Sequence, residues 1–102
     1  MIVRYSRAAK LQMIEIWRYS ARRWGETRAR RYLTDIDQAI CAVRDGRRQP
    51  RAVDAFPALS KVSAASHHAY LALDHEADVL HVVAVLHQRV DPKRRLKKLK
   101  QE

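Results

Sequence analysis

The 102-residue chain is poor in the features that mark exported, disulfide-bonded or membrane proteins. Its single cysteine, Cys41, excludes a disulfide within the chain and fits a reducing compartment, so we expect a cytoplasmic protein. We expect Cys41 to be a small apolar side chain on a helix rather than a nucleophile. Residues 1–10 lack the apolar centre of a signal peptide, and no apolar run approaches the roughly 18 residues of a membrane span.

Acidic residues are also scarce in this chain. Eleven Asp and Glu stand against 21 Lys and Arg, which leaves a net charge of +10. Such an excess favours an acidic partner, either nucleic acid, an anionic membrane or an acidic protein. The hydrophobic fraction of 47% is sufficient for a folded core, and the length fits one domain, residues 1–102.

The first half of the chain has a helical period. A short apolar run at residues 2–5 predicts a strand, and helices are predicted at residues 7–23 and 27–45. Gly25 and Gly46 follow the helices as C-terminal stops. Because the connection between the helices is so short, we expect them to form an antiparallel hairpin.

The second half of the chain loses the helical period. Residues 47–57 contain two prolines and no regular pattern, so they are predicted to be a linker. Strands are predicted at residues 59–64, 69–74 and 79–88, with a tight turn at 74–78. The order indicates an α+β fold in which an N-terminal strand and a helical hairpin accompany an antiparallel sheet. Periodicity leaves the sheet partner of the first strand open.

A short basic helix or tail is predicted at residues 93–100. Asp91 suits its N-cap and Pro92 its first position, and we expect Leu96 and Leu99 to rest on the sheet. The tail has no aromatic residue for base stacking, which argues against recognition of single-stranded nucleic acid there.

The first predicted helix carries two adjacent apolar rows. The first row contains Leu11, Ile14, Trp17 and Trp24. The second contains Met13 and Ile16, with Ala9 and Ser20 in line. We expect the first row to pack the hairpin on the sheet and the second to be exposed for a partner. The alternative is that Met13 and Ile16 simply widen the core face.

Several segments together resemble one protein family. The first helix contributes Leu11, Ile14, Trp17, Tyr19, Trp24 and Gly25, and the second contributes Arg31, Tyr32 and Leu33. Residues 66–70 and 85–92 follow in the predicted sheet. In this order, over nearly the whole chain, they resemble the ParE branch of the RelE/ParE toxins. The resemblance implies a toxin of a type II toxin–antitoxin module, without a cofactor, held inactive by a small acidic antitoxin.

The exposed apolar row and the arginines around it fit such an antitoxin. A helix could lie in a groove of the hairpin, and an extended segment could add to a free sheet edge. Nearby arginines would steer an acidic peptide towards the site. The predicted antitoxin-binding residues are Met13, Ile16, Arg18, Tyr19, Arg22 and Arg23.

The target that the resemblance implies is DNA gyrase for ParE proteins and messenger RNA in the ribosome for RelE proteins. RNA cleavage needs a base, an acid and cations around the phosphate. The predicted strands offer few such groups, and the candidates for a nuclease are Lys61, His67, His87 and Arg89. This scarcity favours a non-enzymatic gyrase inhibitor, with a ribosome-dependent mRNA endoribonuclease as the alternative.

The histidines decide whether a nuclease centre is feasible. His81 and His87 are expected on one strand face about 20 Å apart at roughly 3.3 Å per residue, too far for one centre. His67 with His87 is conceivable if their strands pair. Half-buried histidines bonded to backbone or water are the simpler interpretation.

Two further sets of residues complete the sequence predictions. Gyrase would be contacted by basic residues, predicted to be Lys61, Arg89, Lys93, Arg94 and Arg95, and nucleic acid would be involved only indirectly. Five potential metal ligands lie close together, namely Asp74, His75, Glu76, Asp78 and His81. Their spacing matches no metal-binding motif, so we expect a solvated turn and no metal.

Overall fold

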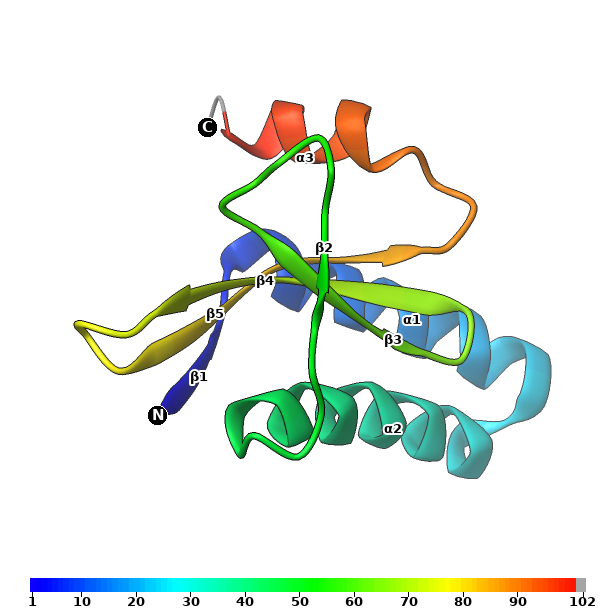
Figure 1. Ribbon diagram of the computed structural model, residues 1–102. Helices are drawn as coiled ribbons and strands as arrows, with labels where there is room; N and C mark the ends of the chain where they lie inside the picture. The colour runs from blue at the N-terminus through cyan, green and yellow to red at the C-terminus, as the bar shows by residue number, and fades with distance from the viewer. Residues whose placement is uncertain (101–102) are drawn as a thin grey trace.

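Five strands form one mixed sheet with helices on both faces in the computed structural model, which describes the backbone of residues 1–100 and the side chains of residues 1–98 (Figure 1). The elements in chain order are β1 (Ile2–Tyr5), α1 (Arg7–Trp24), α2 (Glu26–Arg44), β2 (Arg51–Ala52), β3 (Ser60–Ala64), β4 (His67–Asp74), β5 (Val79–His87) and α3 (Pro92–Lys100). The strand order is β1-β5-β4-β3-β2. The predicted α+β fold is therefore confirmed.

The sheet differs from the sequence prediction at its two edges. β1 pairs with β5 in parallel, whereas the other strand pairs are antiparallel. The prediction that residues 47–57 form a linker is wrong at Arg51 and Ala52, which pair with Lys61 and Ser60 as strand β2. A strand of two residues is too short to show a period, so the sequence pattern does not reveal it.

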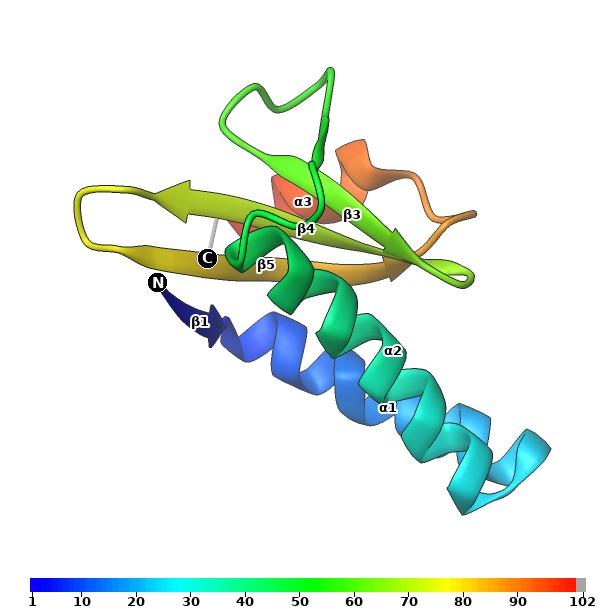
Figure 2. The ribbon, with the colours of Figure 1, turned by 60° about the horizontal axis from the view of Figure 1, so that its bottom comes forward.

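The helices α1 and α2 lie side by side on one face of the sheet (Figure 2). Ser6 caps α1, because its hydroxyl accepts a hydrogen bond from the Ala9 amide at 3.0 Å. Gly25 alone separates the two helices and has φ +92° and ψ 164°, a conformation that other residues rarely adopt. The predicted antiparallel hairpin and its glycine stop are confirmed.

The face that α1 turns towards the sheet is not the predicted one. Ala9 and Ser20 are buried there, and Met13 and Ile16 pack against the core. The bulky row points outward: Leu11 is 52% exposed, Ile14 47%, Trp17 36% and Trp24 40%. The small side chains let α1 approach β5 closely, which the bulky row would prevent. The prediction that the bulky row packs the hairpin on the sheet is wrong.

The opposite face of the sheet is covered by α3. Leu96 is buried against Tyr70, Ala84 and Leu86, as the sequence predicts for Leu96. Asp91 caps this helix, because its carboxylate accepts a hydrogen bond from the Lys93 amide at 3.0 Å. The predicted contact of Leu99 lies outside the described side chains.

A β-bulge in β5 changes which side chains face the helices. Tyr70 pairs with Ala84 and Leu71 pairs with Val82, so Val83 is the extra residue. Val83 has no partner residue in β4, and its carbonyl accepts a hydrogen bond from the Ser6 hydroxyl at 2.8 Å.

The bulge places the histidines of β5 on opposite faces. Before it, Leu80 and Val82 face the helices, and after it Val85 does. By alternation His81 faces away from the helices and His87 towards them. The prediction that these two histidines share one face is wrong, because an inserted residue reverses the alternation.

Candidate functional site

A shallow groove runs between the two helices. Its volume is about 610 Å³, and we call it the hairpin groove. It is lined by Tyr5 from β1, by Lys10, Met13, Ile14 and Trp17 from α1, and by Arg30, Leu33, Thr34 and Asp37 from α2. The walls are mainly apolar, so the groove suits a partner that buries apolar side chains.

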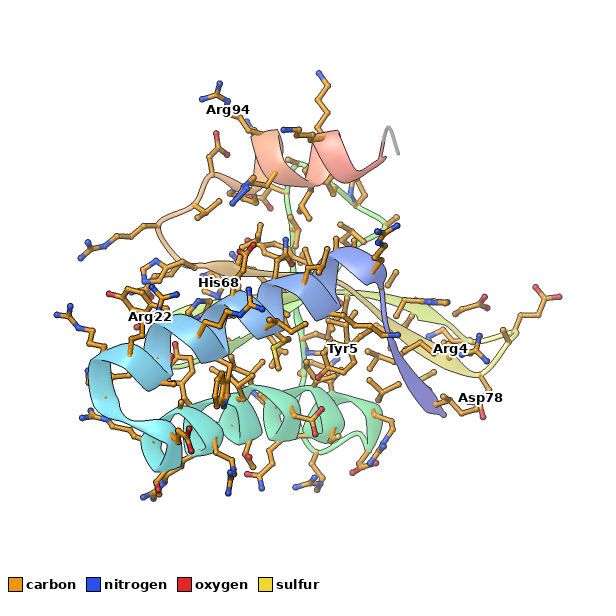
Figure 3. All side chains as sticks on the ribbon, turned by 180° about the vertical axis from the view of Figure 1, so that it is seen from behind. Arg4, Tyr5, Arg22, His68, Asp78 and Arg94 are labelled. Atoms are coloured by element: carbon orange, nitrogen blue, oxygen red, sulfur yellow. The ribbon has the colours of Figure 1, made fainter. Side chains whose placement is uncertain are left out.

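One hydrogen bond crosses the groove. The Tyr5 hydroxyl donates to the Asp37 carboxylate at 2.7 Å and links β1 to α2 (Figure 3). Burial and the adjacent Asp37 carboxylate raise the pKa of Tyr5 far above its ordinary value. The hydroxyl is therefore protonated at neutral pH and remains a donor.

A second concavity lies near the hairpin end of α1. It has a volume of about 530 Å³, and we call it the histidine cleft. It is lined by Glu15, Ile16, Tyr19, Ser20, Arg23 and Trp24 from α1, Tyr32 from α2, Ser66, His67 from β4 and His87 from β5. Aromatic, charged and hydrogen-bonding groups thus converge from both layers of the fold.

His67 and His87 meet in this cleft. They are cross-strand partners, and their ring centroids lie 5.2 Å apart in an edge-to-face arrangement. The condition set by the sequence, that their strands pair, is confirmed. The Tyr32 oxygen lies 2.6 Å from His67 Nδ1 and accepts a hydrogen bond from the Ser66 amide at 3.2 Å.

Hydrogen bonds fix the orientation of both rings. Burial lowers the pKa of His67 to about 4, with a smaller contribution from His87, so His67 is neutral at pH 7. The Tyr32 hydroxyl and His67 Nδ1 share one hydrogen bond, and the tautomer of His67 determines which of the two donates. His87 Nδ1 accepts a hydrogen bond from the Arg89 amide at 3.1 Å.

A small polar cluster lies on the other face of the sheet, and we call it the strand cluster. It consists of Arg51, Lys61, Ser63 and His68. The Ser63 hydroxyl accepts a hydrogen bond from Arg51 at 3.1 Å and lies 2.7 Å from His68 Nδ1. Burial lowers the pKa of His68, and Lys61 and Arg51 add to the effect. Of these residues only Lys61 is a predicted site residue, although Ser63 and His68 alternate with core positions in their strands.

The predicted nuclease residues do not form one centre. Lys61 pairs with Tyr70 and shares its face, which α3 covers. His67 and His87 line the cleft on the helix face. Arg89 lies in the exposed turn after β5. Adjacent strand residues face opposite sides of a sheet, which separates this set.

The remaining predicted residues lie on separate surfaces. On α1, Arg18, Tyr19, Arg22 and Arg23 are exposed. On α3, Lys93, Arg94 and Arg95 are exposed, and Figure 3 shows Arg94 and Arg22 on different layers of the molecule.

Among the residues that the structure describes, no group of three or more His, Cys, Asp or Glu side chains is arranged to hold a metal ion. The turn at 75–78 is exposed, and Asp74 accepts a hydrogen bond from the Ala77 amide at 3.0 Å. No helix within residues 1–100 combines the length and apolar character needed to cross a membrane.

Comparison with known proteins first defines the class of fold. A chain of the structure titled "Chromosomal ParDE TA system from P. aeruginosa" superposes with a TM-score of 0.72. The match covers 85% of this chain and 95% of that chain at 12% sequence identity. At that identity the likeness shows the fold alone.

Sequence comparison then defines the family. The model of the ParE toxin of type II toxin-antitoxin system, parDE, matches residues 3–92. The toxin ParE1 of Mycobacterium tuberculosis is 38% identical over 92 residues, which are 89% of this chain and 93% of that protein. The toxin ParE of Escherichia coli is 33% identical over 89 residues, 86% of this chain and 85% of that protein. The chain belongs to the ParE family of toxins, as its resemblance predicts.

Proposed function

We propose that this toxin acts in the cytoplasm by inhibiting DNA gyrase and that a small acidic antitoxin keeps it inactive by occupying the hairpin groove. Family membership supports the toxin role. The observation that carries the antitoxin site is the exposure of Leu11, Ile14 and Trp17 on α1. Monomeric proteins seldom leave such a row of large apolar side chains in solvent.

The outward-facing row supports a revised position for the antitoxin. Met13 and Ile16 belong mainly to the core, so Ile14 and Trp17 are better anchors for a partner. Lys10 and Arg30 line the same groove and would attract acidic side chains. The occupant proposed here is an amphipathic helix with apolar residues on one face and acidic residues beside them.

Gyrase is proposed to meet the opposite layer of the molecule. Lys93, Arg94 and Arg95 are exposed on α3, and Arg89 lies in the turn before it. Lys61 is half-buried on the face of the sheet that α3 covers. These cations lie on the other side of the sheet from the hairpin groove (Figure 1), so variants at the two surfaces can be assessed separately.

The separation of the nuclease candidates supports a non-enzymatic mode of action. The strand cluster is the one observation that favours the alternative, a ribosome-dependent mRNA endoribonuclease, because it holds histidine, serine and cations together. A base and an acid of this kind are what RNA cleavage needs.

Paired assays on the purified toxin test this choice. Gyrase supercoiling and DNA cleavage are measured beside mRNA cleavage on programmed ribosomes. We expect inhibited gyrase and intact mRNA, with inhibition reduced by Arg94→Gln with Arg95→Gln and unchanged by His68→Gln. Cleaved mRNA with unaffected gyrase, abolished by His68→Gln, would replace the gyrase proposal with the endoribonuclease.

A further inference from the structure

The histidine cleft has no part in the functions proposed above. It lies on the flank of α1 that faces β5, whereas the hairpin groove lies on the flank that faces α2. Its volume of about 530 Å³ falls within the roughly 300–1,000 Å³ of small-ligand sites. We propose that the cleft and the arginines beside it bind single-stranded nucleic acid, with one unpaired base in the cleft.

Aromatic rings form the entrance of the cleft. Tyr19 is 60% exposed and Trp24 40% exposed. Their ring centroids lie 6.3 Å apart in an edge-to-face arrangement, and the ring centroid of Tyr32 also lies 6.3 Å from that of Trp24. Rings that already contact one another lose little freedom when a base stacks on them, and such stacking accepts any base.

The interior of the cleft offers both donors and acceptors. His67 and His87 line it, and the Nε2 atom of each ring, which can donate or accept, has no hydrogen-bond partner among the described residues. The Glu15 carboxylate accepts hydrogen bonds. Base edges present carbonyl and ring-nitrogen acceptors together with amino donors, so a base can use both kinds of group.

A row of arginines continues from the cleft along α1. Arg18, Arg22 and Arg23 line an adjoining hollow of about 540 Å³ together with Glu15 and Tyr19. Glu15, Tyr19 and Arg23 belong to both concavities, so the surface is continuous. The phosphates beside a bound base would reach these guanidinium groups, and the net charge of +10 assists the encounter.

The composition of the surface favours a single nucleic-acid strand over the other acidic partners. The amino group of a base can donate to the Glu15 carboxylate in the cleft, whereas the carboxylate side chains of an acidic peptide have no donor to offer it. A duplex keeps its bases stacked and cannot insert one into a concave site without unstacking it. An aromatic cleft beside a cationic row is the arrangement that sequence-tolerant single-strand binding proteins use.

The test uses the full-length toxin without antitoxin or gyrase, so its result does not depend on the functions proposed above. Fluorescence anisotropy compares a short labelled single-stranded oligonucleotide with an abasic oligonucleotide of the same length and label. We expect the bases to strengthen binding about tenfold, with Trp24→Ala and Tyr19→Ala each removing about that factor for the base-containing strand alone. Far-UV circular dichroism verifies folding, and the high exposure of Tyr19 makes its variant the safer one.

Two matched controls separate stacking from charge. Trp17→Ala removes the same aromatic group two turns earlier in the same row of α1, where it lines the hairpin groove and not the cleft, and it is expected to leave binding unchanged. Arg18→Gln with Arg22→Gln is expected to weaken both strands equally and to reduce the salt dependence by about two phosphate contacts. Equal affinity for the two oligonucleotides, or an equal loss in Trp17→Ala and Trp24→Ala, overturns the proposal. Preferential binding of an acidic peptide that depends on Trp24 also overturns it.

Discussion

The two flanks of α1 offer a partner very different chemistry. The hairpin groove presents Ile14 and Trp17 beside one hydrogen bond between Tyr5 and Asp37. The histidine cleft presents aromatic rings, imidazole groups and guanidinium groups. One helix can line both sites because only Ala9 and Ser20 of α1 are fully buried, which leaves side chains on both flanks accessible.

The difference shows that composition alone does not define the partner of this basic protein. An apolar flank selects a partner by the area it buries, and charge there mainly speeds the encounter. On the cleft flank, charge supplies affinity and the aromatic rings supply the preference for bases. Because the two sites share no lining residue, each can be altered without the other.

The largest expected effect concerns the two tryptophans of α1 and antitoxin binding. Trp17→Ala removes an anchor from the hairpin groove and should weaken binding of the acidic antitoxin by about 2–4 kcal/mol, the range of aromatic hot spots. Trp24→Ala, on the cleft, should change it by less than about 0.5 kcal/mol. Isothermal titration calorimetry measures both. Equal losses would show that the antitoxin spans both flanks.

A smaller effect is expected on stability from neighbouring residues of α1. Met13→Ser exposes core surface and should lower the free energy of unfolding by about 2 kcal/mol. Ile14→Ser should change it by less than about 0.5 kcal/mol, because Ile14 is 47% exposed. Urea denaturation provides the comparison. A larger loss of unfolding free energy in Ile14→Ser than in Met13→Ser would mean that the row with Ile14 packs on the sheet, as the sequence pattern predicts.

The periodicity of apolar residues predicts the order and bounds of most helices and strands well, because it depends on local backbone geometry. The helix at 7–23 extends by one residue to Trp24, and the strand at 69–74 begins two residues earlier, at His67. The glycine stop at Gly25 and the cap at Asp91 follow from backbone chemistry that a short segment contains.

The site could not be predicted to the same extent because it depends on contacts between distant segments. Both apolar rows of α1 satisfy a helical period, and only the fit against β5 selects the row with Ala9 and Ser20. The bulge at Val83 leaves no mark in the periodicity of its strand, yet it determines that His87 faces the cleft. Tyr32 joins His67 across 35 positions, which no local pattern reports.

One side-chain hydrogen bond joins α1 to the edge of β5. The Val85 amide donates to the Gln12 side chain at 2.7 Å, beyond the end of the pairing with β1. Gln12→Met leaves this amide unpaired and should lower the free energy of unfolding by about 1.5 kcal/mol. Gln38→Met, on the exposed surface of α2, is the matched control and should have little effect. Hydrogen exchange of the Val85 amide should accelerate only in Gln12→Met. Unchanged protection of this amide would mean that the packing of α1 on β5 does not need this hydrogen bond.

The smallest expected effect is a pH dependence that belongs to the cleft flank alone. The folded state keeps the pKa of His67 at about 4, below its ordinary value near 6.5, because the ring is buried beside His87. As the pH falls below about 6.5 the unfolded chain takes up the proton first, so the folded state loses stability until the pH reaches the folded pKa. Glu15 and Arg23 of α1 and Tyr32 of α2 line the cleft around this pair and remain in every variant compared.

Between pH 7 and pH 5, with allowance for solvent screening, His67→Gln should reduce the loss of unfolding free energy by about 1 kcal/mol. Urea denaturation at both pH values measures that difference. His81→Gln is the matched control, because His81 is exposed on the opposite face of the sheet, and it should retain the pH dependence of the original protein. If His67→Gln and His81→Gln respond to pH alike, the pH response does not come from the cleft, and the two flanks of α1 differ in shape and charge but not in titration.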